Sequence, residues 1–297
     1  MEFKCGYIAI IGRPNVGKST LINNMVGQKV AIVTWKPQTT RNRLLGIVNK
    51  DNAQIILIDT PGIHKPANQL GKYMQKAVNA ALAGVDGVLY VFDAEKNIIE
   101  DDIMMLERVS KESPVIVLLN KMDRVTPEKI AEMIKELHIK FPNIQAIIPT
   151  AAIKGKNLDM VFDEILKVLP IGERHFDEDY YTDQPTRFLA AEIVREKAFR
   201  VLDKEIPYGI AVVVNAFKEK NNIIHIDADV VVQKDSHKGI VLGKGGETIK
   251  KIGTYARQDL EEILGQQVFL KLFVKVREEW RDSKNFLKDF GYDSGDL

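Results

Sequence analysis

Short apolar runs and amphipathic stretches follow one another along the N-terminal half of the chain. The apolar runs, rich in β-branched residues, predict strands at 7–11, 55–58, 87–92, 115–119 and 146–148. Apolar residues at helical spacing predict helices at 18–26, 70–83, 101–109, 127–139 and 158–168. Because strands that are apolar throughout are buried on both faces, this alternation indicates an α/β domain with a mostly parallel sheet between two helical layers.

The pattern changes after residue 170. Pro170 and Gly172 end the last of these helices, and the acidic stretch 177–183 carries no core pattern, so we predict a linker at 171–184. The expected elements then run helix, strand, strand, turn, helix, strand and helix, at 187–202, 210–218, 223–233, 243–246, 247–264, 268–276 and 278–290. Asn221-Asn222 marks a hairpin between the two strands. The sequence therefore predicts an α/β domain at 1–170 and an α+β domain at 185–297.

Composition limits the classes of protein that remain. The length of 297 residues fits two domains, and 45% apolar with 28% charged residues excludes a mostly disordered chain. A net charge of +1 gives no global attraction to nucleic acid or membrane, so such binding needs a local patch. The single cysteine, Cys5, excludes an intrachain disulfide and a cysteine zinc site. Without a signal peptide or an apolar stretch long enough to span a membrane, we expect a cytoplasmic protein.

A phosphate-binding loop joins the first strand to the first helix. Residues 12–19 fit the pattern G-x-x-x-x-G-K-[ST], in the strand–turn–helix context that this pattern requires. Backbone N–H groups and the helix N-terminus attract phosphate, Lys18 reaches the β- and γ-phosphates, and the Ser19 hydroxyl binds Mg²⁺. We expect the phosphates of a nucleotide to contact Gly12, Arg13, Pro14, Asn15, Val16, Gly17, Lys18, Ser19 and Thr20.

Two further motifs follow later strands. In Asp59-Thr60-Pro61-Gly62, the carboxylate is placed to hold Mg²⁺ and the Gly62 N–H to meet the γ-phosphate. In Asn120-Lys121-Met122-Asp123, the Asp123 carboxylate accepts from N1–H and the 2-amino group of guanine, which adenine lacks. We expect Lys121 to pack on the base and Asn120 to brace the loop. Thr150, Ala151 and Ala152, after the last strand, are expected to offer backbone N–H groups to guanine O6.

The polar loop 34–41 is expected to act as the switch that senses the γ-phosphate. One of its threonines should complete the Mg²⁺ shell, and spacing leaves Thr39 and Thr40 as alternatives. Ile63 occupies the position after the D-x-x-G motif, where Ras-type GTPases carry a water-orienting glutamine. We therefore expect slow intrinsic hydrolysis of GTP.

A second candidate site lies in the C-terminal part. Gly243-Lys244-Gly245-Gly246 is a G-x-x-G turn between two helical segments, within an α-β-β-α-α-β order. Such a turn lets a sugar–phosphate backbone approach closely, as in KH modules that clamp single-stranded RNA. We expect RNA at Gly243, Lys244, Gly245, Gly246, Lys250 and Lys251.

Together these motifs resemble the Era family, in the TrmE/Era branch of translation-associated GTPases. The resemblance rests on the phosphate loop with Pro14-Asn15, the Pro37-Gln38-Thr39-Thr40-Arg41 switch, 59–62, 120–123 and a following KH-like domain that includes 203–209. It implies a type II KH domain, binding to the single-stranded 3′ end of small-subunit ribosomal RNA, and a role in assembly of the 30S subunit. It also implies peripheral membrane association, and we expect a monomer.

The resemblance also assigns roles in the switch. It makes Thr40 the Mg²⁺ ligand with Ser19 and Asp59, and a hydrophobic residue such as Ile63 is usual in this branch. Catalysis is then expected from Lys18, Thr40, Gly62 and Asn15. Asn15 either helps to hold K⁺ beside the phosphates, as in related GTPases, or only braces the loop.

Two alternatives to a GTP-driven switch remain open. One is an RNA-binding module whose nucleotide site is structural, with negligible turnover. The other is a GTPase that acts on membranes.

Overall fold

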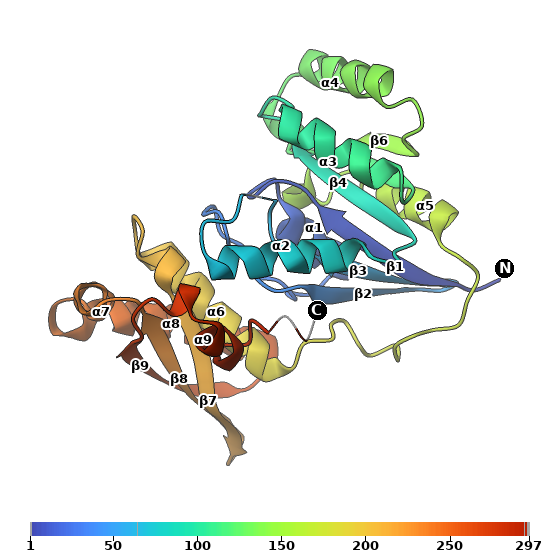
Figure 1. Cartoon of the computed structure of the whole chain (residues 1–297). Helices are drawn as coiled ribbons and strands as arrows, with labels where there is room; N and C mark the ends of the chain where they lie inside the picture. The colour runs from blue at the N-terminus through green and yellow to red at the C-terminus, as the bar shows by residue number, and fades with distance from the viewer. Residues whose placement is uncertain (1, 64, 294, 296–297) are drawn as a thin grey trace.

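Two separate sheets organise the chain, and the computed structural model describes residues 2–63, 65–293 and 295 (Figure 1). Positions 1, 64, 294, 296 and 297, which belong to the two predicted domains, lie outside the described residues. The first sheet belongs to the N-terminal part and the second to the C-terminal part. The predicted order of α/β followed by α+β is therefore confirmed.

The first sheet has six strands in the order β2-β3-β1-β4-β5-β6. Every neighbouring pair is parallel except β2–β3. The strands are β1 (Lys4–Ile11), β2 (Leu44–Lys50), β3 (Ala53–Asp59), β4 (Gly87–Asp93), β5 (Val115–Asn120) and β6 (Ala146–Pro149). The carboxyl ends of the parallel strands meet at one edge, where ligands bind in sheets of this kind.

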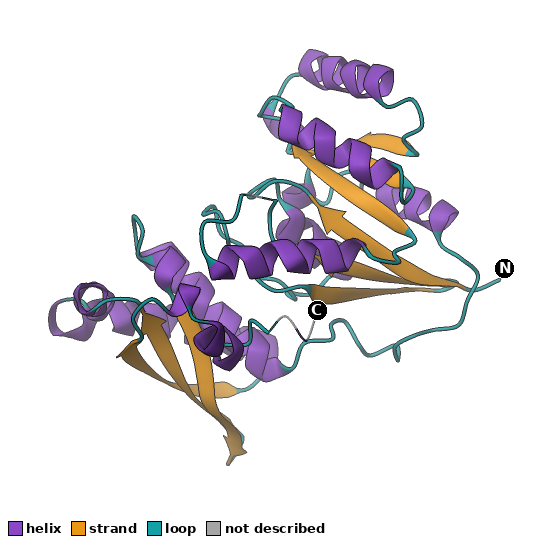
Figure 2. Cartoon of the chain, in the orientation of Figure 1, coloured by secondary structure: helices purple, strands orange, loops and turns teal. Residues whose placement is uncertain are grey.

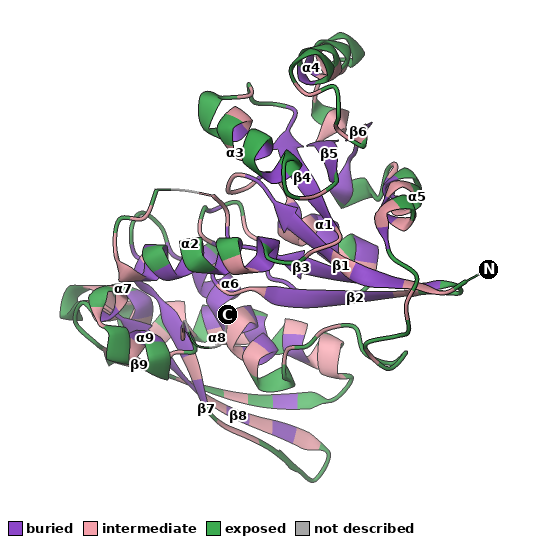
Figure 3. Cartoon of the chain, turned by 45° about the vertical axis from the view of Figure 1, so that its right-hand side comes forward, coloured by how far each residue is buried: buried purple, intermediate pink, exposed green. Residues whose placement is uncertain are grey.

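Helices cover both faces of this sheet, and the strands between them are buried (Figures 2 and 3). Side chains of α1 and α5 pack on one face, and those of α2, α3 and α4 pack on the other. The helices are α1 (Lys18–Val26), α2 (Gln69–Leu82), α3 (Glu100–Ser110), α4 (Pro127–Lys140) and α5 (Leu158–Val168). All five coincide with the predicted helices to within one or two residues.

Strand β2 is an element that the hydrophobic pattern did not predict. It pairs antiparallel with β3 at the edge of the sheet, in register from Leu44 opposite Asp59 to Lys50 opposite Ala53. Gly46 interrupts its apolar run, and Asn49 and Lys50 extend it with polar residues. The strand therefore depends on its partner rather than on a strong pattern of its own.

The second sheet has the order β7-β8-β9, with β7–β8 antiparallel and β8–β9 parallel. The hairpin between β7 (Ala211–Lys220) and β8 (Ile223–Val232) turns at Asn221 and Asn222, which have φ of 53° and 59°. Strand β9 (Gln267–Val276) follows two helices, α7 (Asp235–Leu242) and α8 (Glu247–Leu264). With α6 (Thr186–Val201), these helices share a hydrophobic core with one face of the sheet.

The predicted single helix at 278–290 is wrong. A short turn, Trp280–Asp282, precedes α9 (Lys284–Asp289), and the Ser283 side chain caps α9 by accepting from the N–H of Phe286. Glu279 has a positive φ of 48°, so no helix begins at 278, and Ser283 has an extended backbone (φ −93°, ψ 115°) that separates the turn from α9. This break lets the buried Trp280 pack with Leu70 and Tyr73 of α2, so the two parts of the chain share a small core.

The predicted linker packs against strands β1, β3 and β2 of the first sheet. Its backbone donates or accepts hydrogen bonds at both ends, from Ile171 opposite Lys4 to Thr182 opposite Gly46. In the middle, the fully buried Gln54 side chain accepts from the N–H groups of His175 and Phe176. This segment is therefore attached to the sheet by hydrogen bonds, although its sequence has no core pattern.

Candidate functional site: a nucleotide pocket and an RNA groove

The phosphate loop lies between β1 and α1, at the carboxyl edge of the sheet. Lys18 is buried under the loop, and its Nζ donates to the carbonyl oxygens of Gly12 (2.9 Å) and Arg13 (3.0 Å). Burial lowers the pKa of Lys18 to about 8, and the nearby Asp59 carboxylate opposes that shift. A phosphate beside Nζ favours the charged form of this lysine in the same way.

Three oxygen atoms meet beside the loop. The Ser19 Oγ lies 2.8 Å from Thr40 Oγ1 and 2.9 Å from Asp59 Oδ2, and Thr40 Oγ1 lies 3.4 Å from the same carboxylate oxygen. Burial raises the pKa of Asp59, while Lys18 and the hydrogen bonds to the carboxylate lower it. Hard oxygen donors of this kind suit Mg²⁺, and a bound cation would compensate the buried carboxylate.

The structure separates the two candidate threonines. Thr39 Oγ1 donates to the carbonyl of Lys36 (2.7 Å) and lies 2.6 Å from Thr34 Oγ1, within the switch loop itself. Thr40 instead turns toward Ser19 and Asp59. Of the two alternatives left by spacing, only Thr40 lies with the other predicted Mg²⁺ ligands.

The base-recognition loop connects several parts of the pocket. Asn120 Nδ2 donates to the carbonyl of Val16 (2.7 Å), and its Oδ1 accepts from the N–H of Ala152 (2.9 Å). Lys121, in the left-handed conformation, pairs through Nζ with Asp93 at 2.6 Å. These bonds hold the loop against the phosphate loop and against the segment after β6.

Asp123 faces the pocket with one oxygen paired and one unpaired. Its Oδ2 lies 2.8 Å from Lys154 Nζ, and its buried Oδ1 has no hydrogen-bond partner among the described residues. The hydrogen bond from Lys154 lowers the pKa of this carboxyl group, so it is ionised near neutral pH. An ionised acceptor with an unsatisfied oxygen suits the paired donors of guanine.

The prediction for residues 150–152 needs correction. The N–H of Thr150 donates to Leu119 O (2.9 Å), and that of Ala152 donates to Asn120 Oδ1. Only the N–H of Ala151 has a long bond, 3.4 Å to Lys156 O, which a ligand could replace. Two of the three backbone N–H groups therefore donate to other groups of the protein and not to guanine O6.

These elements enclose a cavity of about 500 Å³, a size typical of small-ligand sites. Predicted residues that line it are Pro14, Asn15, Gly17, Lys18, Ser19, Thr20, Thr39, Thr40, Gly62, Asn120, Lys121, Asp123 and Ala152. Val16, Asp59, Thr60, Pro61, Thr150 and Ala151 are buried behind these. The Arg13 side chain turns away and pairs with Asp102 at 3.1 Å.

The G-x-x-G turn lies between α7 and α8. Gly243, Gly245 and Gly246 have φ of 73°, 61° and 84°, which favours glycine at each of them. A Cβ at Gly243 would lie 2.2 Å from Thr248 Oγ1, whereas one at Gly245 would meet nothing within 4 Å. The outer face of the turn is thus open to a ligand.

A groove lies between α8 and β9 and begins at Ile249, in the first turn of α8. Its first part, about 270 Å³, is lined by Ile249, Lys250, Gly253, Thr254, Arg257, Leu270 and Leu272. A second depression, also lined by Arg257, includes His225 and Phe269. Of the predicted basic residues, Lys250 lines the groove, while Lys251 lies over the Tyr255 ring, 5.9 Å from its centroid.

Several residues of these sites were missed by the sequence prediction. Asp93 and Lys154 contact Lys121 and Asp123 from distant segments, so no local motif reveals them. The groove did leave a signal, because Lys250, Gly253, Thr254 and Arg257 recur at helical spacing.

Comparisons with known proteins match both parts of the chain. A family model described as a 50S ribosome-binding GTPase matches residues 7–121, and a KH-domain model matches residues 205–281. GTPase Era of Clostridium tetani is 47% identical over 293 residues, which are 98% of this chain and 99% of the relative. GTPase Era of Clostridium botulinum strain Alaska E43 is 47% identical over 292 residues, with 98% and 99% covered.

Solved structures extend the similarity to the whole fold. A tyrosine-to-alanine variant of Aquifex aeolicus Era bound to GDP.AlF4⁻ matches with a TM-score of 0.94 and 43% identity, covering 98% of this chain and 99% of that one. An Era complex with MgGDPNP and nucleotides 1506–1542 of 16S ribosomal RNA gives a TM-score of 0.94 and 44% identity, with the same coverage. With this identity along nearly its full length, the chain belongs to the Era family of GTPases, in which a KH domain follows the GTPase domain.

Proposed function

We propose that this GTPase is a switch that binds the single-stranded 3′ end of small-subunit ribosomal RNA and acts in assembly of the 30S ribosomal subunit. The observation that carries the proposal is that one chain has a nucleotide pocket at one sheet edge, an open G-x-x-G turn, and a groove along the following helix lined by Lys250 and Arg257. A solved Era complex contains the 3′ region of 16S ribosomal RNA, which gives the RNA its identity.

In this proposal the functional units are residues 1–170, the connection 171–184 and residues 185–297. The first unit binds and hydrolyses GTP. The last unit holds four or so nucleotides at the turn, as KH modules do. Gly243, Lys244, Gly245 and Gly246 approach the RNA backbone, and Lys250 contributes charge along the groove.

The nucleotide roles follow the pocket. Lys18 neutralises the β- and γ-phosphates, Asp123 selects guanine, and Gly62 borders the place of the γ-phosphate. Ser19, Thr40 and Asp59 hold Mg²⁺, which when bound neutralises charge on the phosphate oxygens. The related Era complex with ribosomal RNA contains MgGDPNP, in line with this ligand set.

Asn15 is proposed to contact K⁺ beside the phosphates. Its Nδ2 donates to the carbonyl of Trp35 (2.6 Å), so the amide oxygen is the atom that would face a cation. The alternative, that Asn15 only braces the switch through that bond, predicts no difference between K⁺ and Na⁺.

Peripheral association with the inner face of the cell membrane, which the family resemblance implies, and a monomeric state are further parts of the proposal. No helix in the described ranges 2–63 and 65–293 is long and apolar enough to cross a bilayer. Sedimentation with liposomes tests the first, and the mass measured in solution tests the second.

One experiment separates the switch from an RNA-binding module with a structural nucleotide. Phosphate release is measured with GTP alone and with an RNA of the small-subunit 3′ end, and the affinities for this RNA and for a scrambled RNA of equal length are measured on the same protein. We expect turnover with GTP and specific binding of the 3′-end RNA. Negligible turnover in both conditions would favour the structural nucleotide site, and equal affinity for the scrambled RNA would contradict the proposed partner.

A further inference from the structure

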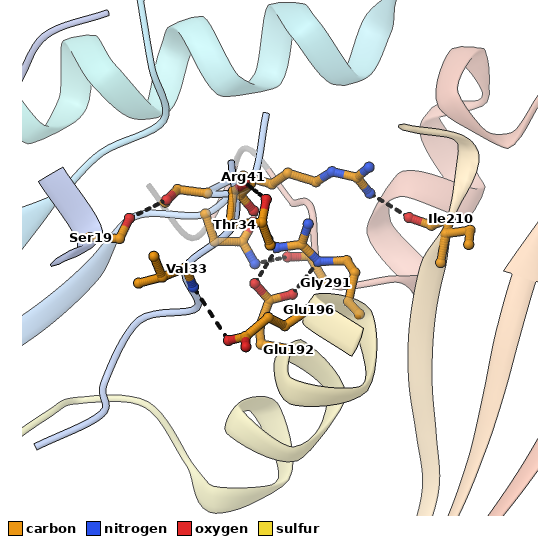
Figure 4. A network of polar contacts seen from close by, with 12 residues as sticks. Ser19, Val33, Thr34, Arg41, Glu192, Glu196, Ile210 and Gly291 are labelled. Atoms are coloured by element: carbon orange, nitrogen blue, oxygen red, sulfur yellow. Dashed lines mark hydrogen bonds and ion pairs between the residues drawn. The ribbon is translucent and has the colours of Figure 1, made fainter. Parts of the chain in front are cut away.

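Two buried arginines connect the switch loop to the KH domain. Arg41, at the end of the loop, is 1% exposed and points away from the nucleotide pocket. Its Nη1 donates to the carbonyl of Ile210 at 2.6 Å and its Nη2 to that of Tyr208 at 3.0 Å. Figure 4 shows this side chain reaching the start of β7. The Arg41 guanidinium therefore bonds to the second domain and does not face the phosphates.

Arg195 makes the connection in the other direction. It lies on α6, is fully buried, and donates through Nη2 to the carbonyl of Thr39 at 2.5 Å. The same guanidinium forms a two-bond pair with Glu192, one turn earlier on α6. This pair fixes the orientation of the guanidinium, so that one N–H is aimed at the switch backbone.

The contact of Arg195 adjoins the Mg²⁺ ligand set. Thr39 and Thr40 share a peptide bond, and the Thr40 hydroxyl lies 2.8 Å from Ser19 and 3.4 Å from Asp59. Fixing the Thr39 carbonyl on one side of this peptide limits the rotation that would turn Thr40 away. Figure 4 shows Ser19, Glu192 and Glu196 within one network of polar contacts.

A second line of contacts links the loop to the helix that begins at the G-x-x-G turn. The N–H of Val33 donates to Glu196 on α6 at 3.3 Å. Lys29 pairs with Glu196 at 3.1 Å and with Asp259 on α8 at 2.8 Å. The segment just before the switch loop is thus attached to α6 and α8 together.

Stability alone does not explain these arginines. Nη1 of Arg195 and Nε of Arg41 are buried and have no hydrogen-bond partner among the described residues. A buried charge with an unsatisfied donor is costly, and an apolar side chain of similar volume is often as stable or more so. The arrangement fits a role in fixing one conformation of the switch.

We propose that Arg195 and Arg41 are positioning residues for GTP hydrolysis, which act by holding Thr40 against Ser19 and Asp59 when the KH domain is docked. This inference rests on the proposed role of Thr40 in the nucleotide site. Because coupling between two binding sites is reciprocal, GTP that holds Thr40 in place also favours the docked KH domain.

The test compares Arg195→Met with Arg187→Met in the full chain. Arg187 is a matched control, because it lies on the same helix and its Nε donates to Val214 O (2.9 Å) within the KH domain. We expect kcat for GTP hydrolysis to fall roughly 10- to 100-fold in Arg195→Met, the cost of a misplaced catalytic group. GDP affinity should stay unchanged, and the Mg²⁺ concentration for half-maximal rate should rise. Arg187→Met should keep the wild-type values.

A double variant shows whether Arg195 acts through Thr40. If it does, Thr40→Ala with Arg195→Met is no slower than Thr40→Ala alone. Losses that multiply would overturn the inference, since Arg195 would then act elsewhere. If Thr40→Ala loses activity while Arg195→Met keeps it, the inference fails and the proposed function stands. If Thr40→Ala keeps full activity, the proposed role of Thr40 fails, and the inference fails with it.

A second variant covers the case in which Arg195→Met does not fold. Arg195→Lys keeps the positive charge beside Glu192, but a lysine lacks the planar fork that reaches two partners at once. We expect a folded protein by circular dichroism, with kcat reduced several-fold and the Mg²⁺ requirement raised. Wild-type kcat and Mg²⁺ dependence in this variant would overturn the inference.

Discussion

A Cβ atom at Gly17 would lie 2.2 Å from Nδ2 of Asn120, so the phosphate loop and the base-recognition loop touch. Because Gly17 also has a φ of 106°, only glycine fits this position without strain. The hydrogen bond from Asn120 to Val16 fixes the same contact. The spacing between the phosphate loop and the base-recognition loop is therefore set by direct contact.

Guanine specificity is expected to depend on Asp123. Asp123→Asn removes the carboxylate that accepts from N1–H and the 2-amino group, so binding of both GTP and GDP should weaken by about 1–3 kcal/mol. Xanthine nucleotides, which carry an oxygen at C2, should bind better to the variant than to the wild type. Calorimetry with GDP and xanthosine diphosphate measures both. Asp163→Asn, at an exposed position of α5, is the control; full GTP affinity in Asp123→Asn would contradict the pocket assignment.

The two threonines of the switch should differ in their effect on hydrolysis. Thr40→Ala removes a hydroxyl that meets Ser19 and Asp59, whereas Thr39→Ala removes one that bonds within the loop. We expect a large loss of kcat and a higher Mg²⁺ requirement only for Thr40→Ala. A Mg²⁺ titration of phosphate release for both variants gives the comparison. An equal loss in the two would show that the loop conformation, rather than one ligand, limits the rate.

The nucleotide motifs could be predicted from sequence because each is local. A strand, a turn and a helix of fixed spacing place Lys18 and Ser19, and the same logic places Asp59 and Asp123 at the carboxyl edge of one sheet. Spacing alone left the choice between adjacent threonines open, because both belong to the same loop. Side-chain direction there depends on what the loop packs against.

The remaining features depend on contacts between distant segments. Lys154 reaches Asp123 only after β6 has paired with β5, and β2 exists only through its pairing with β3. Arg195 contacts the switch because α6 docks beside it, 156 residues away along the chain. Hydrophobic periodicity does not predict such docking, since the residues involved are polar.

Hydrolysis is expected to be faster in K⁺ than in Na⁺. Asn15 has a φ of 64°, so Asn15→Gly removes the side chain without straining the loop. In the wild type we expect higher turnover in potassium chloride than in sodium chloride at equal ionic strength, and no such difference in Asn15→Gly. Phosphate release in the two salts is the measurement. Equal rates in the two salts for the wild type would contradict a K⁺ site, and Asn15 would then only brace the switch through its bond to Trp35.

RNA binding should depend on the basic side chains at the turn and groove, and barely on the nucleotide pocket. Substitution of Gly245 is a poor test, because its φ of 61° would strain most other residues. The charge is better reversed at Lys244, within the turn, and at Lys250, in the groove. Each reversal turns an attraction of about 1 kcal/mol at ~4 Å in water into a repulsion, so Lys244→Asp with Lys250→Asp should weaken RNA binding at least about tenfold. The dependence of affinity on salt should also become less steep, because fewer phosphates are neutralised.

Lys135→Asp with Lys140→Asp on α4 changes the net charge equally and should leave RNA affinity nearly unchanged. Filter binding at several salt concentrations, beside GTP affinity on the same proteins, separates a local contact from a general charge effect. Equal losses in the two double variants would mean that net charge, and not the KH groove, attracts the RNA.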